Sequence, residues 1–229
     1  MNYKYIFLDL DDTIWDFHAN TKLTLNEIYE TRNLGDYFDS FEQYFAIYSK
    51  RNLELWELYG RSEITKEALS FERFLHPLRE VGAANDELAL IMGKEYLEML
   101  PTRTALVPHA LELLDYLAPK YPLTIVSNGF IEVQYRKLKN CTLDHYFSHV
   151  VLSEEAGALK PDKRIFEHAL QLNGANASET IMIGDSYEAD ILGAQNAGID
   201  QIYFRYSKTN PNQRATFTVD SIREIIKIL

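Results

Sequence analysis

The stretch YIFLDLDDTIWDF, residues 5–17, passes from four apolar or aromatic residues straight into an acidic cluster. The run Tyr5–Leu8 predicts a buried β-strand, and the carboxylates of Asp9, Asp11 and Asp12 follow at its end. At about 4 Å and an effective dielectric constant of about 20, two carboxylates repel each other by about 4 kcal/mol. A buried strand that ends in so much like charge indicates a functional requirement at this point of the chain.

The length and composition are those of an ordinary globular protein. The chain has 229 residues, enough for one large domain or for a domain that carries a substantial insertion. Hydrophobic residues make up 46%, and the net charge is −11, from 34 acidic and 23 basic residues. This acidic balance argues against a nucleic-acid polymer or an anionic membrane as the partner. It still allows a small phosphorylated molecule, where a metal ion and a local lysine reverse the sign of the field.

Cysteine usage and the N-terminus bear on the compartment. The one cysteine, Cys141, excludes an intramolecular disulfide, and the six histidines show no metal-ligand spacing with it. No apolar stretch at the N-terminus is long enough for a signal peptide, and no window approaches a membrane span. We therefore expect a protein of the reducing cytoplasm.

Strand-like and helix-like segments alternate along much of the chain. Short β-type runs occur at Tyr5–Leu8, Leu123–Val126, Val150–Leu152, Thr180–Ile183 and Gln201–Phe204. Helical patterns occur among the later runs, at Ala110–Leu117, Ile131–Leu138, Arg164–Leu172 and Ile191–Ala197. Strands that alternate with helices indicate a parallel sheet of right-handed crossover units, and hence an α/β fold.

The alternation is interrupted after the first strand by a helical insertion. Residues 18–100 show helical periodicity and no convincing strand. Ser40 with Gln43 fits a capping box, Asn85 fits the N-cap of a further helix, and Pro101 would end that helix. We therefore predict a core of residues 1–16 and 102–229, with residues 17–101 inserted as an all-helical cap domain.

Polar residues gather where the predicted strands end. Asp9 follows the first strand, Ser127 and Asn128 follow the second, Lys160 lies in the loop after the third, and Asp185 follows the fourth. In an open parallel α/β sheet, ligands bind beyond the carboxyl ends of the strands. Each residue alone would fit a turn, a helix N-cap or a solvated lysine. Their convergence on one edge of the sheet favours a functional site.

Four short motifs carry a family resemblance: DLDDT at 9–13, SNG at 127–129, KPD at 160–162 and GDSYEAD at 184–190. In this order they resemble the four motifs of the haloacid dehalogenase (HAD) superfamily of phosphohydrolases. The resemblance spans the whole core, and the insertion lies where the helical-cap subgroup places its cap. It implies a Rossmann-like core, a bound Mg²⁺ ion and an aspartyl-phosphate intermediate.

The resemblance implies catalytic and metal-binding roles for three aspartates. Asp9 would be the nucleophile, and Asp11 would protonate the leaving alcohol and then activate water. Since positions i and i+2 of a strand share a face, we expect both carboxylates to approach one phosphorus atom. Mg²⁺ would be bound by Asp9, by the main-chain carbonyl of Asp11 and by Asp185. The acidic cluster would then be tolerated because a divalent cation lies in it.

The remaining motif residues would hold the phosphoryl group and support the site. Ser127, the Asn128 amide and the Lys160 ammonium would bind the transferring phosphoryl oxygens and offset their charge. Asp190, five residues after Asp185, is placed to orient a metal-bound water or Lys160 rather than to bind the ion directly.

Asp11 also separates this chain from other chemistries of the superfamily. Dehalogenases lack the second acidic residue, phosphonate hydrolases have a small residue there, and transport ATPases have a threonine together with membrane spans. Phosphomutases share all four motifs and remain an alternative. A receiver-like signalling domain, which accepts phosphate on an aspartate without turnover, is a further alternative; such domains are much shorter and lack the insertion.

Three segments point to a substrate class: SNGF at 127–130, SEEAG at 153–157 and KPDKRIFEHAL at 160–170. They are most similar to the helical-capped 5′-nucleotidases that act on pyrimidine nucleoside monophosphates. For such a substrate, Trp56, Tyr59 and Arg73 would contact the base and sugar. The alternative for each is packing within the cap's own core, which helical spacing favours. Sugar phosphates and sugar-acid phosphates are the alternative substrates.

Overall fold

The computed structural model describes residues 3–206 and 214–229. The chain divides into two compact units. The first consists of Met1–Phe17 and Thr104–Leu229, and the second is His18–Arg103. The second unit is thus inserted into the first.

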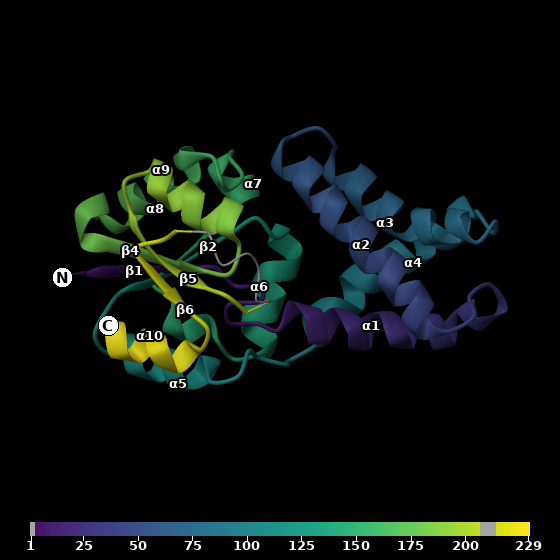
Figure 1. Cartoon of the computed structure of the whole chain (residues 1–229), viewed down its shortest axis with the longest axis horizontal. Helices are drawn as coiled ribbons and strands as arrows, with labels where there is room; N and C mark the ends of the chain where they lie inside the picture. Colours follow the sequence, from purple (N-terminus) through teal and green to yellow (C-terminus); the bar gives the residue numbers. More distant parts are fainter. Residues whose placement is uncertain (1–2, 207–213) are drawn as a thin grey trace. The chain divides into compact units, whose positions relative to one another are not determined.

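The first unit is built on a parallel β-sheet (Figure 1). Its described strands are β1 (Tyr5–Leu8), β2 (Leu123–Ser127), β3 (His149–Leu152), β4 (Thr180–Gly184), β5 (Asp200–Phe204) and β6 (Phe217–Val219). Their order in the sheet is β3-β2-β1-β4-β5-β6, and all neighbouring pairs are parallel. This is the strand order of a Rossmann-like α/β core, in which the order reverses between β1 and β4.

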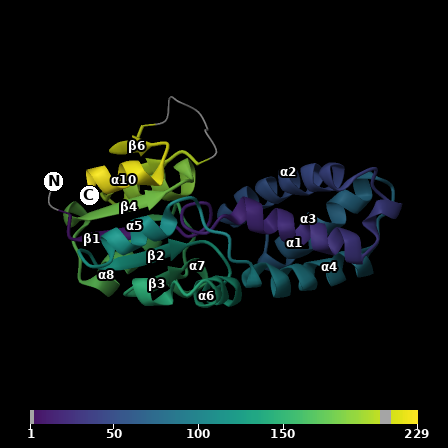
Figure 2. The same ribbon diagram turned by 90° about the horizontal axis from the view of Figure 1, so that it is seen from below.

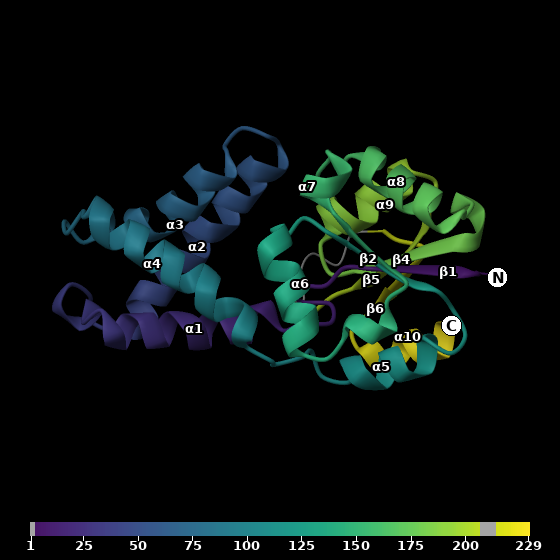
Figure 3. The same ribbon diagram turned by 180° about the vertical axis from the view of Figure 1, so that it is seen from behind.

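Helices cover both faces of this sheet, so the central strands are apolar on both sides. Helices α8 (Lys163–Asn173) and α9 (Gly193–Asn196) lie on one face, where Phe7 of β1 packs in a core cluster with Phe166 (Figures 1 and 3). Helices α5 (Ala110–Leu117) and α10 (Ile222–Ile228) pack together on the other face. The remaining α-helices in the described residues of this unit are α6 (Ile131–Asn140) and α7 (Ser153–Ala156).

The strand predictions are confirmed. The structure differs from the prediction in the helix near Ile191 and in two short elements that the sequence did not predict. All five predicted strands are present, and the helix predicted over Ala110–Leu117 has these bounds. The helix predicted over Ile191–Ala197 instead begins as a π-helical segment, Tyr187–Leu192, and continues as α9. Strand β6 and helix α10 were not predicted, because three and seven residues are too short to establish a period.

The second unit is all-helical, and no strand occurs in it. It contains α2 (Phe41–Gly60), α3 (Lys66–Glu80) and α4 (Asp86–Met99), together with α1 (Phe17–Thr31) from its second residue on. The four helices lie side by side (Figure 2). They enclose an aromatic core that includes Tyr44, Tyr48, Phe74 and Tyr96. No helix in the described ranges of either unit combines the length and apolar character that a membrane crossing requires.

The two predicted helix caps of this unit are confirmed. Ser40 Oγ accepts a hydrogen bond from the main-chain N–H of Gln43 at 3.2 Å, which begins α2. Asn85 Oδ1 accepts one from the N–H of Leu88 at 3.0 Å, which begins α4. The Gln43 side chain returns to the N–H of Asp39, one residue before the N-cap, rather than to Ser40 itself.

Candidate active site

Two carboxylates meet where the strand order of the sheet reverses. Asp9 directly follows β1, and Asp185 directly follows β4, the parallel neighbour of β1. The main-chain N–H of Asp9 donates to the carbonyl of Ile183 at 2.9 Å, which fixes Asp9 to the end of β4. The point of reversal, beyond the carboxyl ends of the strands, is the usual ligand site of such sheets.

Lys160 joins this edge from the loop before α8. Its Nζ lies 2.6 Å from Oδ1 of Asp9, 2.6 Å from Oδ1 of Asp190 and 2.8 Å from the carbonyl oxygen of Val126. These three contacts use all three donors of the ammonium group. Lys160 and Asp190 are 3% and 0% exposed, so this is a buried network and not a surface ion pair.

Burial sets the protonation properties of the cluster. Burial raises the pKa of Asp9 to about 7 against the opposing charge of Lys160, and Asp190 and Asp11 add to the rise. Burial, followed by the charges of Asp9 and Asp190, raises the pKa of Asp185 well above its usual range. Burial alone would lower the pKa of Lys160, but Asp190 and Asp9 outweigh it and the pKa is raised. The carboxylates therefore lack sufficient positive charge from the protein alone.

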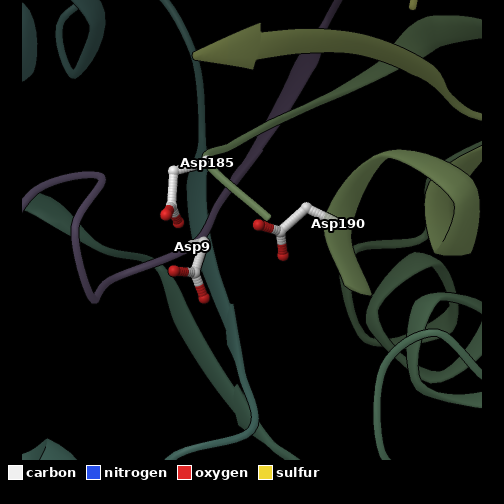
Figure 4. A group of neighbouring side chains, drawn as sticks. All are labelled: Asp9, Asp185 and Asp190. Atoms are coloured by element: carbon white, nitrogen blue, oxygen red, sulfur yellow. The ribbon is translucent and has the colours of Figure 1, made fainter. Parts of the chain in front are cut away.

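A divalent cation fits this deficit. Carboxylate oxygens of Asp9, Asp185 and Asp190 lie within 4.8 Å of one another (Figure 4). With all groups ionised, three carboxylates and the Lys160 ammonium leave two negative charges. Oxygen ligands of this kind suit Mg²⁺.

The hydrogen bonds divide the three aspartates by role. Both oxygens of Asp190 are engaged, Oδ1 with Lys160 and Oδ2 with the main-chain N–H of Ser186 at 3.0 Å. Asp185 accepts one long hydrogen bond, 3.5 Å, from the Thr13 hydroxyl. Asp9 and Asp185 thus have more oxygen lone pairs available to a cation than Asp190 has.

The Asn128 side chain supports the lysine loop. Its Nδ2 donates to the carbonyl of Lys160 at 2.9 Å, and its Oδ1 accepts from the main-chain N–H of Lys160 at 2.8 Å. This two-point pairing fixes the backbone from which the Lys160 ammonium extends. One Nδ2 proton and the Oδ1 atom of Asn128 are therefore engaged in holding this loop, and its main-chain N–H is a donor that could serve a ligand.

Ser127 is arranged to donate a hydrogen bond. Its Oγ accepts from the N–H of Gly129 at 3.1 Å and from Nε2 of Gln134 at 2.8 Å. A hydroxyl has two acceptor positions and one proton. With both acceptor positions filled, the proton remains for an acceptor such as a phosphoryl oxygen.

The prediction that Asp9 and Asp11 lie on one face of a strand is wrong. Strand β1 ends at Leu8, and the chain turns at Asp12, whose φ of 55° lies in the left-handed region. Asp11 therefore does not share a strand face with Asp9. Its carboxylate is instead held by Gln134 and Lys137 of α6.

Those two residues of α6 were missed by sequence reasoning. Gln134 and Lys137 are both buried and lie three positions apart, so they face the same way from the helix. The available signal was their position beside Val133 and Leu138, the buried apolar residues of that helix. A glutamine and a lysine on an apolar face require polar partners.

The predicted substrate residues all belong to the helical unit. Arg73 is 2% exposed, and its guanidinium lies 4.6 Å from the centre of the Tyr96 ring. Trp56 and Tyr59 are half-buried and pack edge to face, with ring centres 5.6 Å apart. Arg73 is thus enclosed in the core of its unit, whereas Trp56 and Tyr59 retain exposed surface.

The chain matches known proteins along most of its length. The family model of haloacid dehalogenase-like hydrolases matches residues 3–198. HAD-hydrolase YfnB of Bacillus subtilis is 31% identical over 230 residues, covering 99% of this chain and 95% of YfnB. The chain therefore belongs to the haloacid dehalogenase-like hydrolase family, and it is an enzyme of that family.

Relatives that match the chain over its whole length include two named pyrimidine 5′-nucleotidase. Pyrimidine 5′-nucleotidase PynA of Streptococcus pneumoniae is 30% identical over 233 residues, covering 100% of this chain and 96% of PynA. Pyrimidine 5′-nucleotidase YjjG of Escherichia coli is 30% identical over 233 residues, covering 100% of this chain and 99% of YjjG. A crystal structure of YfnB bound to magnesium superposes with a TM-score of 0.91 and 28% identity, over 100% of this chain and 99% of YfnB.

Proposed function

We propose that this protein is a Mg²⁺-dependent phosphomonoester hydrolase that acts through a phosphorylated Asp9. The observation that carries the proposal is the buried network in which Lys160 joins Asp9 to Asp190 beside Asp185. The network holds one oxygen of Asp9 and places a cation site and an ammonium group beside it. That is the arrangement a carboxylate nucleophile needs in order to approach an anionic phosphate.

The reaction has two displacements. In the first, Asp9 attacks phosphorus, and Asp11 gives a proton to the leaving alcohol oxygen as its bond to phosphorus breaks. In the second, Asp11 takes a proton from water, which attacks phosphorus and returns Asp9 to its free carboxylate. Inorganic phosphate and an alcohol are the products.

Binding of the phosphoryl group falls to three donors from two loops. The Ser127 hydroxyl, the main-chain N–H of Asn128 and the Lys160 ammonium supply these donors. Lys160 would hold the phosphoryl oxygens only by sharing its donors with Asp9 and Asp190. Asp9, Asp185 and the main-chain carbonyl of Asp11 would hold Mg²⁺, which when bound neutralises charge on the phosphate.

We further propose nucleoside monophosphates, pyrimidine nucleotides among them, as the substrates. The names of PynA and YjjG support this proposal, since both relatives match the whole chain. His18–Arg103 would serve as the cap domain that selects the substrate. Trp56 and Tyr59 retain exposed surface and are the proposed contacts to the base. Arg73 would contribute to substrate binding from its buried position in the core of the helical unit.

The covalent mechanism is tested by Asp9→Asn. An amide is a poor nucleophile and cannot form the phosphorylated intermediate, so release of phosphate should fall to background while the circular-dichroism spectrum stays unchanged. Phosphate release with Mg²⁺ is the measurement. Near-normal kcat in this variant would refute the role of Asp9.

The substrate class is tested by a panel of monophosphates compared by kcat/KM. Pyrimidine and purine nucleoside monophosphates are set against sugar phosphates and sugar-acid phosphates with the same leaving-group type. The proposal predicts the highest kcat/KM for a nucleotide. A best substrate without a base would replace it with a sugar-phosphate phosphatase.

A further inference from the structure

The carboxylate of Asp11 is held from α6 through both of its oxygens. Lys137 Nζ lies 2.6 Å from Oδ1, and Gln134 Nε2 donates to Oδ2 at 2.8 Å. Each carboxylate oxygen can accept two hydrogen bonds, so each keeps one acceptor position. The Asp11 side chain is 28% exposed, so the contacts with α6 do not bury it. The carboxylate is oriented without being covered.

The charge of Lys137 is directed at Asp11. The Lys137 side chain is 3% exposed, and its Nζ lies 4.1 Å from the centre of the Trp15 ring and 5.6 Å from that of Phe17. Within residues 3–206 and 214–229, Asp11 is the one carboxylate paired with it. An apolar side chain would pack against the two rings without the cost of burying an ammonium group. Packing alone therefore does not account for a lysine here.

Gln134 links Asp11 to the phosphoryl-binding side of the site. Its Nε2 uses both protons, one to Asp11 at 2.8 Å and one to Ser127 Oγ at 2.8 Å. A Cβ atom on Gly129 would lie 2.1 Å from this nitrogen, so the glycine leaves the space that the amide occupies. One amide group thus sets the position of Asp11 relative to Ser127.

We propose that Gln134 and Lys137 are positioning residues that hold the Asp11 carboxylate toward the oxygen of the leaving group. The proposal rests on the proposed function, in which Asp11 transfers its proton to that oxygen. Gln134 and Lys137 act through Asp11. Without them Asp11 can rotate away, while Asp9, Lys160 and Asp185 keep their places.

The effect of losing the Gln134 or Lys137 contact on kcat/KM depends on the leaving group. An alkoxide must be protonated as it departs, whereas p-nitrophenolate departs well without a proton. A misplacement of about 1 Å can cost about 10²-fold in rate. We therefore expect Lys137→Met to lower kcat/KM by about 10- to 100-fold for an alkyl monophosphate. For p-nitrophenyl phosphate we expect a loss below about 3-fold, because little acid catalysis is required.

The experiment measures kcat/KM of the Mg²⁺-loaded enzyme for a series of substituted phenyl phosphates and one alkyl monophosphate. This parameter includes the steps up to departure of the leaving group, so hydrolysis of phosphorylated Asp9 does not enter it. The variants are Lys137→Met, Gln134→Leu and Gly129→Ala, the last of which displaces Gln134 without removing a polar group. Each should steepen the dependence of log kcat/KM on leaving-group pKa.

Three comparisons separate positioning from a general structural effect. Lys139→Met, an exposed lysine on the same helix, should leave the dependence unchanged. Lys137→Arg should retain most of the kcat/KM that Lys137→Met loses, because a guanidinium also donates to a carboxylate. In an Asp11→Asn background, Lys137→Met should have no further effect on the dependence. If Lys137→Met does not fold, Gln134→Leu and Gly129→Ala test the same dependence, in addition to a loss common to all leaving groups from the Gln134–Ser127 hydrogen bond.

The outcomes distinguish this proposal from the proposed function. For Lys137→Met, an equal loss for every leaving group, or the same loss in the Asp11→Asn background, would overturn the positioning role. If the wild-type enzyme hydrolyses the series and every variant keeps the wild-type dependence of log kcat/KM on leaving-group pKa, this proposal alone is overturned. A wild-type enzyme that releases no phosphate from any of the compounds would overturn both.

Discussion

Individual side chains at the edge of the sheet are held in a network that is short of positive charge. Lys160 satisfies one oxygen each of Asp9 and Asp190 and has no donor left for Asp185. The two excess negative charges lie in a buried site, where unpaired charge is costly. The stability of the protein without metal should therefore depend on the protonation of these carboxylates.

The first prediction concerns the metal-free protein at different pH values. The pKa of Asp9 is raised by burial to about 7, and the pKa of Asp185 is raised for the same reason. An unfolded aspartate has a pKa of about 4, so between about pH 4 and 7 the folded state binds more protons. The free energy of unfolding contributed by this site should therefore fall as the pH rises through that range. Denaturant unfolding in the presence of a chelator measures it.

Mg²⁺ and a single substitution supply the controls for that prediction. Saturating Mg²⁺ should reduce the loss at pH 7, because a bound cation stabilises the ionised carboxylates. Asp185→Asn should also reduce the pH dependence, since one carboxylate is removed. The metal-free wild type and the metal-free Asp185→Asn variant are compared by how their free energies of unfolding change from pH 4 to 7. An equally large increase in both proteins would contradict the prediction.

The second prediction concerns Gly184, the last residue of β4. A Cβ atom there would lie 2.2 Å from Oδ2 of Asp190, which is fixed by Lys160 and Ser186. Gly184→Ala should therefore lower the free energy of unfolding by about 1–3 kcal/mol. It should also lower kcat by about tenfold or more through the displaced network.

Gly60→Ala is the matched control for Gly184→Ala. No atom lies within 4 Å of a Cβ built on Gly60, which is the last residue of α2. Alanine should be tolerated there with unchanged kcat. Equal losses from the two substitutions would show that the crowding at Asp190 is not the cause.

Elements differ in how far their sequences determine them. The run Tyr5–Leu8 was predicted as a strand with its observed bounds, because a short apolar segment next to turn residues has few other solutions. The stretch around Ile191 was predicted as a helix but is π-helical from Tyr187 to Leu192. That segment carries Asp190 into contact with Lys160, a tertiary constraint that periodicity does not contain.

The same distinction holds for the site. Asp9, Asp185 and Lys160 were predictable, because each lies in a short motif where a strand or loop ends. Gln134 and Lys137 were not, because their partner Asp11 is more than one hundred residues away in the sequence. The orientation of Asp11 depends on a turn at Asp12 that no strand pattern reveals.

The third prediction concerns the N-cap of α2. Ser40→Ala removes the acceptor for the N–H of Gln43 and should lower the free energy of unfolding by about 1 kcal/mol. Urea denaturation followed by far-UV circular dichroism measures it. Ser49→Ala, inside the same helix, is the control and should be neutral or slightly stabilising. An effect of Ser40→Ala no larger than that of the control would remove the capping role.

At the scale of the whole molecule, the proposed metal ligands all lie in one unit. Asp9, Asp11 and Asp185 belong to the unit of Met1–Phe17 and Thr104–Leu229, and none belongs to His18–Arg103. A ligand stabilises the structure that binds it. The effect of Mg²⁺ should therefore be unequal between the units.

The fourth prediction follows from that division. Mg²⁺ should slow amide hydrogen exchange in the residues that follow β1 and β4, with a smaller change in α2 and α3. Hydrogen–deuterium exchange with mass spectrometry, with and without Mg²⁺, measures this. Asp185→Asn should weaken the protection. Protection confined to the helical unit would place the cation elsewhere.

The insertion also delays the synthesis of the strands that pair with β1. β1 leaves the ribosome before its sheet partners, which begin only at Leu123 and Thr180. At about 5–20 residues per second, the residues between Leu8 and Leu123 take roughly 6–23 s to be made. Throughout that interval YIFL has no neighbouring strand, whereas the helical unit already has all its residues by Arg103. The nascent chain thus exposes the apolar segment of β1 even after the helical unit has been synthesised. Slow translation prolongs the exposure of this segment to chaperones and to aggregation.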